Sequence, residues 1–353
     1  MNSTILASNH FASLQRMVVT VFLLMLVAVI VFSLSYGQVI LGGERLLAAV
    51  LDPSGDPVAS QIVRDIRLPR VLTGLIAGAA LGISGVLMQA LFRNPMADAW
   101  SLGLLAGGQL GVSLIVTAAA FAGPAALAFL TAFQGIGLTS GAILGVAVFA
   151  VLMAGLSRRV SNITLLVVGL MLGFTVQGLV SIVMHFASRV GGRVYSGWND
   201  GTFASTEISD VAVMLLPIGL GLVLAIVSAK GLSAMLLGET YARSMGTDVK
   251  RLRWLTLSAV VLLVAPVTAY CGPVTFIGLI VPHFARAMVR TSQILPLLPI
   301  AALCGALLAL SADAIVHLPW EQHFLHLNAI LALVGAPVVI AILLASPSLR
   351  GRI

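Results

Sequence analysis

The sequence VLTGLIAGAALGISGVLMQALF occupies residues 71–92 and contains no charged side chain. An apolar run of about 20 residues is long enough to cross the hydrocarbon core of a bilayer as one helix. Glycines recur along it at intervals of three or four, at Gly74, Gly78, Gly82 and Gly85. Small residues at this spacing let a neighbouring helix approach closely, which is how helices associate in lipid. The run therefore predicts a tightly packed transmembrane helix.

The rest of the chain repeats this apolar character. Of its 353 residues, 59% are hydrophobic and 9% are Asp, Glu, Lys or Arg, whereas a soluble domain carries roughly 25% charged residues. The apolar runs are continuous rather than alternating, which favours helices over a transmembrane β-barrel. We expect an all-α polytopic membrane protein that forms a single transmembrane domain over residues 1–353. About ten spans are expected, near Met17–Ser35, Val71–Phe92, Ala99–Phe121, Phe133–Leu156, Leu165–Phe186, Val211–Ala229, Trp254–Cys271, Phe276–Arg286, Leu295–Ala312 and Leu327–Leu344.

The charged residues are unevenly distributed between the two sides that these spans define. With a cytoplasmic N-terminus, 13 of the 19 Lys and Arg residues lie inside, together with three of the 12 acidic residues. Because cytoplasmic loops carry an excess of Lys and Arg, this predicts cytoplasmic N- and C-termini and an even number of spans. The basic residues stand singly, without a basic stripe or interleaved aromatic residues, so we expect no nucleic-acid partner.

Motifs for enzymatic chemistry are few. The P-loop pattern GxxxxGK[ST] does not occur, which indicates that the chain has no nucleotide site of that kind. Ionisable residues are nearly absent from the apolar runs, whereas proton-driven transporters place them there. The cysteines lack the spacing of a zinc site, and we expect no metal site.

One protease-like motif is present. Residues 82–85 fit the GxSG pattern of intramembrane serine proteases, in which Ser84 would need a histidine base. His185 and His283 are the candidate bases. The same glycines extend the small-residue ladder, and a serine there usually bonds to its own helix backbone, so we interpret Ser84 as a packing residue.

The longest cytoplasmic stretch, about residues 230–251, reads KGLSAMLLGETYARSMGTDVKR. Its glycines predict two short helices broken at Gly238 and Gly246. An amphipathic face would consist of Leu236, Leu237, Tyr241 and Met245. Such a face suits a helix lying on the membrane interface, or a docking surface for a cytoplasmic protein.

Four motifs follow one another in an order that is known from a family of membrane proteins. They are RLPRVL at 67–72, GAALGISGVLMQALFRNPMAD at 78–98, LGETYARSMG at 237–246 and GPVTFIGLIVPHFAR at 272–286. Ser311–Asp313 and Gly335–Pro337 add two later marks. Together they resemble the FecCD-type permeases, the transmembrane subunits of type II ABC importers for iron-siderophores, haem and cobalamin.

The resemblance implies an importer assembled from several subunits. Ten helices per subunit, a second copy or a sister permease, two cytoplasmic ATP-binding subunits and a periplasmic or lipid-anchored substrate-binding protein are expected, in the lipid of a bacterial inner membrane. ATP would be bound by the partner subunits, so the permease is no enzyme and needs no cofactor. We expect a ferric siderophore as the substrate, moved by alternating access. Haem or cobalamin is the alternative substrate, and proton-coupled secondary transport and intramembrane proteolysis are the remote alternatives.

The resemblance also assigns roles to individual residues. The residues that match the ATPase-coupling segment are Gly238, Glu239, Ala242, Arg243 and Gly246. The residues that match binding-protein docking arginines on the outer face are Arg67 and Arg70. The residues that match the cytoplasmic constriction are Asn94, Pro95, Met96, Ser161 and Asn162. We expect the translocation path to continue along Thr164, Thr175 and Gln177. The residues that match the second family signature are Gly272, Pro273, Gly278, Pro282, His283 and Arg286.

The sequence departs from the family pattern after Asp313. His317 stands where an arginine is usual, and Leu325–Leu331 replaces a Leu-Pro-x-Gly-x-x-Thr run. We hypothesise that His317 takes over part of the docking role, so that the binding protein binds more tightly at mildly acidic pH. A metal site is the rival interpretation of the outer-side cluster formed by His317, His323, His326 and Glu321.

Overall fold

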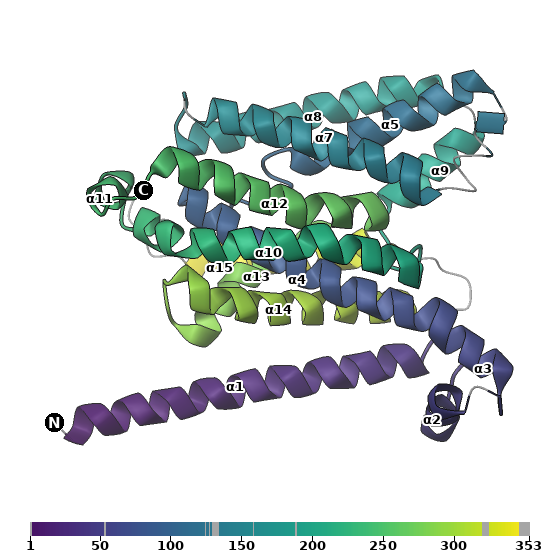
Figure 1. Ribbon diagram of the computed structural model, residues 1–353, viewed down its shortest axis with the longest axis horizontal. Helices are drawn as coiled ribbons and strands as arrows, with labels where there is room; N and C mark the ends of the chain where they lie inside the picture. Colours follow the sequence, from purple (N-terminus) through teal and green to yellow (C-terminus); the bar gives the residue numbers. More distant parts are fainter. Residues whose placement is uncertain are drawn as a thin grey trace.

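The computed structural model describes residues 2–52, 54–123, 125–126, 128, 134–157, 159–187, 189–319 and 325–345. Within these ranges the regular secondary structure is helical, as the composition predicts. Eight of the described helices are long and apolar enough to cross a membrane, and two shorter apolar helices, α13 (Ile277–Val289) and α15 (Leu327–Ala345), complete the expected ten. The long helices run side by side along the long axis of the molecule (Figure 1).

The remaining helices include long ones that the sequence predicts and short ones that it does not. In chain order they are α1 (Asn2–Ser35), α2 (Gly43–Leu51), α3 (Pro57–Gln61), the π-helical turn η1 (Ile62–Arg67), α4 (Leu68–Phe92), α5 (Leu104–Ala122), α7 (Gln134–Leu156), α8 (Asn162–His185), α9 (Arg189–Asn199), α10 (Ile208–Leu236), α11 (Glu239–Ser244), α12 (Val249–Cys271) and α14 (Ile294–Val316). The short helices α2, α3 and α9 were not predicted, because they lack an apolar run of membrane length.

The predicted ends of the long helices differ from the observed ends by several residues. The helix predicted from Trp254 begins at Val249, where the Asp248 side chain accepts hydrogen bonds from the backbone N–H groups of Lys250 and Arg251. The helix predicted to end at Ala229 continues to Leu236. Hydropathy marks the part of a helix that faces lipid, whereas capping groups outside that part decide where the helix ends.

The helix α4 lies in the middle of the bundle, and the glycine ladder explains how its neighbours approach it. A Cβ atom on Gly82 would lie 2.5 Å from the carbonyl oxygen of Ala301 in α14. Gly78 faces the backbone of Gly305 in the same helix, and Gly85 faces the backbone of Gly278 in α13. The predicted close packing of this face is therefore confirmed, with the backbones of α13 and α14 occupying the space of side chains.

The helices α5, α7 and α8 lie together on one side of α12 (Figure 1). The two ends of the bundle differ. The short helix α11 and the start of α1 lie at one end, which we call the α11 end. The short helices α2, α3 and α9 lie at the opposite end, which we call the α9 end.

Candidate coupling site and outer vestibule

The predicted coupling segment forms a separate short helix at the α11 end. Gly238 and Gly246 both adopt positive φ angles, of 126° and 80°. Residues with a Cβ atom rarely adopt such angles. These two glycines break the chain where the sequence predicts, so that α11 follows α10 and precedes α12 in the chain and lies beyond their ends (Figure 1). The third residue of the segment that the resemblance marks, Ala242, is fully buried and fastens α11 to the bundle.

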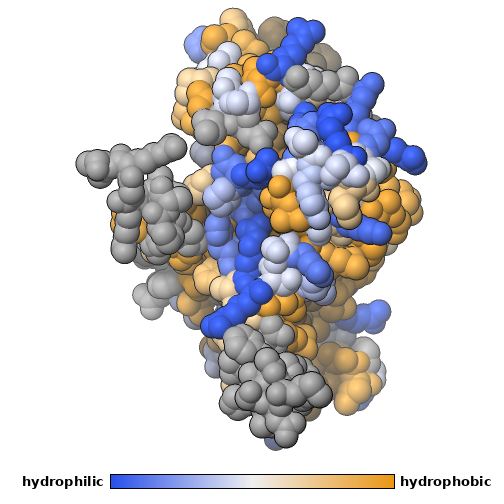
Figure 2. Space-filling view, turned by 90° about the vertical axis from the view of Figure 1, so that its left-hand side faces the viewer, coloured by the Kyte–Doolittle hydropathy of each residue, from blue (hydrophilic) through white to orange (hydrophobic). Residues whose placement is uncertain are grey.

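The apolar face predicted for α11 and its flanking residues is exposed except at Leu236, which ends α10 and packs against the core. Leu237, Tyr241 and Met245 are 68%, 45% and 66% exposed. Figure 2 faces this end of the molecule and shows apolar patches beside a band of hydrophilic residues. An exposed apolar group with a polar rim is typical of a protein-interaction surface.

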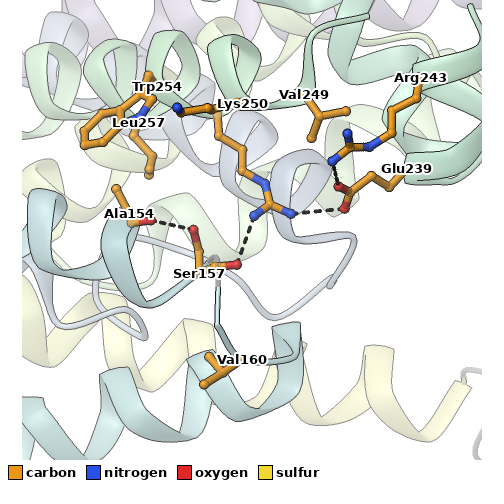
Figure 3. Close-up of a pocket in the computed structure, with 10 residues that line it drawn as sticks. Ala154, Ser157, Val160, Glu239, Arg243, Val249, Lys250, Trp254 and Leu257 are labelled. Carbon is orange, nitrogen blue, oxygen red and sulfur yellow. Dashed lines mark hydrogen bonds and ion pairs between the residues drawn. The ribbon is translucent and has the colours of Figure 1, made fainter.

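Glu239 pairs with one arginine of its own helix and with one arginine of α12, and the second pair connects α11 to the bundle (Figure 3). Its Oε1 accepts a hydrogen bond of 2.8 Å from Arg243, and its Oε2 accepts one of 3.1 Å from Arg253 of α12. Arg253 also donates to the backbone carbonyl of Ser157 at the end of α7, at 2.9 Å. The hydrogen bond from Arg243 and the positive charges of Arg253, Arg243 and Arg93 lower the pKa of Glu239, so this carboxylate stays ionised at neutral pH.

These side chains border a cavity of about 410 Å³ at the α11 end. Figure 3 shows α7, α11 and α12 contributing to its wall. The residues that line it are Ala154, Ser157, Val160, Glu239, Arg243, Val249, Lys250, Arg253, Trp254 and Leu257. The cavity lies between α11 and the connection between α7 and α8. Arg253 bonds to both sides of it, to Glu239 of α11 and to Ser157 of the connection.

The residues that match the cytoplasmic constriction lie in two helix connections. In the connection from α4 to α5, Asn94 Oδ1 accepts a hydrogen bond from the Met96 backbone N–H at 2.9 Å, and the carbonyl of Pro95 accepts one from His283 at 3.1 Å. In the connection from α7 to α8, Ser161 caps α8 by accepting a hydrogen bond from the backbone N–H of Thr164. Asn162 is the first residue of α8. The role of these residues as a gate stays a prediction.

The expected path residues of α8 face outward in the single chain. Thr175 donates a hydrogen bond to the Met171 carbonyl of its own helix, and Gln177 is exposed. Apolar side chains of the same helix are also exposed, among them Phe174 at 55% and Ile182 at 61%. This face is therefore free to line a path or to meet another subunit.

The second family signature is a packing device at both ends of α13. Gly272 has a φ of 75° and lies against the backbone of Trp198, and Gly278 packs against α4. Pro282 lies inside α13, where it is buried. Arg286 donates to Gln89 of α4 at 2.7 Å, and Gln89 donates to the carbonyl of Leu279 at 3.1 Å.

The serine of the protease-like motif has no access to water. Ser84 is 1% exposed and donates a hydrogen bond of 2.8 Å to the Leu81 carbonyl of its own helix. His283 is committed to the carbonyl of Pro95. This arrangement supports the packing interpretation of Ser84.

At the α9 end, Arg67 and Arg70 are buried in the single chain rather than exposed on its surface. Their exposed fractions are 4% and 5%. Arg67 donates hydrogen bonds to the carbonyls of Leu34, at 2.6 Å, and of Val39, and thereby fixes the end of α1. Arg70 donates to the carbonyl of Ser33 at 3.1 Å, and its Nε lies 3.2 Å from Oδ2 of the buried Asp313. A buried carboxylate on α14 and carbonyls at the end of α1 outcompete water for these guanidinium groups.

His317 joins the same cluster. Its Nδ1 lies 3.2 Å from Oδ1 of Asp313, on the opposite side of the carboxylate from Arg70. His326 lies 3.4 Å from Asp200 instead, so the two histidines face different carboxylates. His323 and Glu321 lie outside the described residues. Among the residues described, no three His, Cys, Asp or Glu side chains converge as metal ligands.

A large cavity of about 890 Å³ opens between these groups, and we call it the outer vestibule because the predicted topology puts this end outside. Arg67, Arg70, Asp313, His317 and His326 all line it. These polar side chains stand in a wall that also contains apolar residues, such as Ile66, Val316 and Leu325. The docking role of Arg67, Arg70 and His317 stays a prediction, and it would require a partner to reach into the vestibule.

Sequence reasoning missed two residues that link separate elements, one at each end of the bundle. Arg253 is the first. The second is Asn328, whose side chain donates to the carbonyls of Pro273, at 2.7 Å, and Asp200, at 3.3 Å, and accepts from Thr275. Asn328 falls in the run that departs from the family pattern, where glycine is usual, and this departure was the only available signal.

The structure is thus a bundle of apolar helices with a short exposed helix at one end and a large cavity at the other. A model of the FecCD transport family matches residues 24–345, and the chain belongs to this family. It is therefore the permease subunit of a type II ABC importer, a class whose permeases work with a partner ATPase and a substrate-binding protein.

Named relatives and solved structures agree with this assignment. The chain is 31% identical over 284 residues to the vitamin B12 import system permease protein BtuC of Vibrio cholerae, covering 79% of this chain and 82% of the relative. It is 30% identical to the ferric enterobactin transport system permease protein FepD of Escherichia coli, covering 79% and 80%. A solved structure described as an inward-facing conformation of a metal-chelate type ABC transporter matches with a TM-score of 0.78 and 27% identity, covering 94% of this chain and 100% of that chain.

Proposed function

We propose that this chain forms the membrane path of an importer for a metal chelate, with a ferric siderophore as the substrate. The observation that carries the proposal is the match, over 94% of the chain, to a metal-chelate type transporter. FepD, a ferric enterobactin permease, supports the siderophore. Cobalamin, itself a cobalt chelate, is the second candidate, because BtuC relatives carry vitamin B12 in their name.

The assembly that we propose has two permease chains, two cytoplasmic ATP-binding subunits and one substrate-binding protein. The exposed apolar surface of α11 supports docking of the ATP-binding subunits at the α11 end. The exposed face of α8 supports pairing with a second permease chain along the path. The coupling segment and the start of α1 lie at the same end, which favours a cytoplasmic N-terminus in a bacterial inner membrane.

The proposed mechanism is alternating access. A loaded binding protein docks at the outer vestibule, ATP binding by the partners moves α11, and the connections that hold Asn94 and Asn162 open or close the inner end of the path. The chain needs no strong substrate site of its own in this mechanism. Recognition of the chelate then belongs to the binding protein.

An uptake assay tests the proposal. The permease is reconstituted in liposomes with its ATP-binding subunit and its binding protein, and uptake of labelled ferric siderophore, cobalamin and haem is compared. ATP-dependent uptake of the ferric siderophore is expected. Uptake of cobalamin or haem alone would overturn the siderophore assignment, and uptake that follows a proton gradient without ATP would overturn the importer mechanism.

A further inference from the structure

Arg253 makes the contact that spans the cavity at the α11 end. It lies in the first turns of α12, where it is largely shielded from solvent, and its two terminal nitrogens bind acceptors on two other elements. One acceptor is the carboxylate of Glu239 in α11, and the other is the carbonyl of Ser157. Carbonyls at a helix C-terminus lack partners within the helix and carry partial negative charge, so an arginine is well suited to this position.

The acceptors of Arg253 belong to two segments that the sequence analysis assigns to coupling and to the gate. Ser157 directly follows α7, and Ser161, which caps α8, lies four residues further along the same connection. Glu239 begins α11, the predicted ATPase-docking helix. The guanidinium group holds both acceptors at once because its donors form a rigid planar fork, which a lysine ammonium group lacks.

We propose that Arg253 is a positioning residue that transmits movement of α11 to the connection between α7 and α8, and so couples ATP hydrolysis to opening of the path. This inference rests on the proposed function, because it assumes that an ATP-binding subunit moves α11. Without the bridge from Arg253, the cavity beneath α11 lets that helix move while the α7–α8 connection stays in place.

The ratio of ATP hydrolysed to ligand imported tests the inference. The full complex is reconstituted in liposomes, with labelled ferric siderophore and labelled cobalamin as the transported probes. We expect Arg253→Ala to raise the ratio about tenfold, the size of effect expected when one charge-assisted hydrogen bond is lost. Arg253→Lys keeps the charge but not the fork, and we expect an intermediate ratio. Arg251→Ala removes an exposed arginine two positions away in α12 and should keep the wild-type ratio.

A structural role would give a different result. If Arg253 only stabilised the fold, hydrolysis and import would fall in parallel with the amount of folded complex, and an unchanged ratio in Arg253→Ala would overturn the inference. Should Arg253→Ala fail to fold, Arg253→Lys decides in the same way. Failure of the wild-type chain to bind the ATP-binding subunit at all would instead contradict the proposed function.

A distance measurement provides an independent readout. Spin labels at Ser244 of α11 and at Arg159 in the α7–α8 connection report whether the two segments move as a unit. We expect ATP to move both labels together in the wild-type complex, so that their separation stays nearly constant. In Arg253→Ala the separation should change on ATP binding, and an equally constant separation in both proteins would contradict the inference.

Discussion

Replacing Arg70 tests whether this arginine stabilises the fold through its ion pair with Asp313. The Arg70 side chain and the Asp313 carboxylate are both almost fully buried, with their charged atoms 3.2 Å apart. Arg70→Met leaves Asp313 without its strongest countercharge and also removes the hydrogen bond to the carbonyl of Ser33. Removing one member of a buried ion pair costs about 3–5 kcal/mol, because the other charge stays desolvated.

The assay is unfolding of the purified permease in mixed micelles, followed by circular dichroism. Arg70→Met should lower the free energy of unfolding by about 3–5 kcal/mol, and the double variant Arg70→Met/Asp313→Asn should recover most of this loss, because no uncompensated charge remains. Arg64→Met removes an exposed arginine from η1 of the same end and should change the free energy by less than about 0.5 kcal/mol. A wild-type free energy for Arg70→Met, or a double variant no more stable than the single one, would refute this reasoning.

Three further outcomes follow from the packing and from the polar groups. Gly82→Ala places a Cβ atom 2.5 Å from the Ala301 carbonyl oxygen and should lower the free energy of unfolding by about 1–3 kcal/mol. Gly219→Ala, with open space around it, should be neutral or slightly stabilising. Equal effects of the two substitutions would contradict the close packing. Ser84→Ala should retain ligand uptake within about twofold, because Ser84 only bonds to its own helix. Loss of uptake in this variant would contradict the packing interpretation of Ser84. The docking hypothesis for His317 predicts that the binding protein binds the wild type more tightly at pH 6 than at pH 8 and that His317→Ala reduces this difference; identical pH profiles would end this hypothesis.

The spans and the break in the coupling segment could be predicted because their causes are local. The apolar run of residues 71–92 and its glycine spacing lie within one helix. They predict a face for close packing without any knowledge of which helices pack against it. Gly238 and Gly246 end helices through their own backbone conformation. Such features can be predicted from the residues next to them in the sequence, because those residues determine the backbone conformation and the apolar run.

The roles of the arginines could not be predicted because their partners come from distant elements. Hydropathy places Arg70 at the outer end of a span but says nothing of Asp313, which α14 brings to it. Arg253 precedes the predicted span from Trp254 and stands near two other basic residues, so nothing in the sequence marked it out, and its acceptors lie on α11 and just after α7. Tertiary packing, rather than local pattern, decides whether such a residue is exposed or bonded.

The measurement that tests the central claim most directly is ligand uptake by reconstituted liposomes that contain the permease with or without its ATP-binding subunits. The account predicts accumulation against a gradient only when the ATP-binding subunits, ATP and the loaded binding protein are all present. Accumulation driven by the permease chain alone would contradict it.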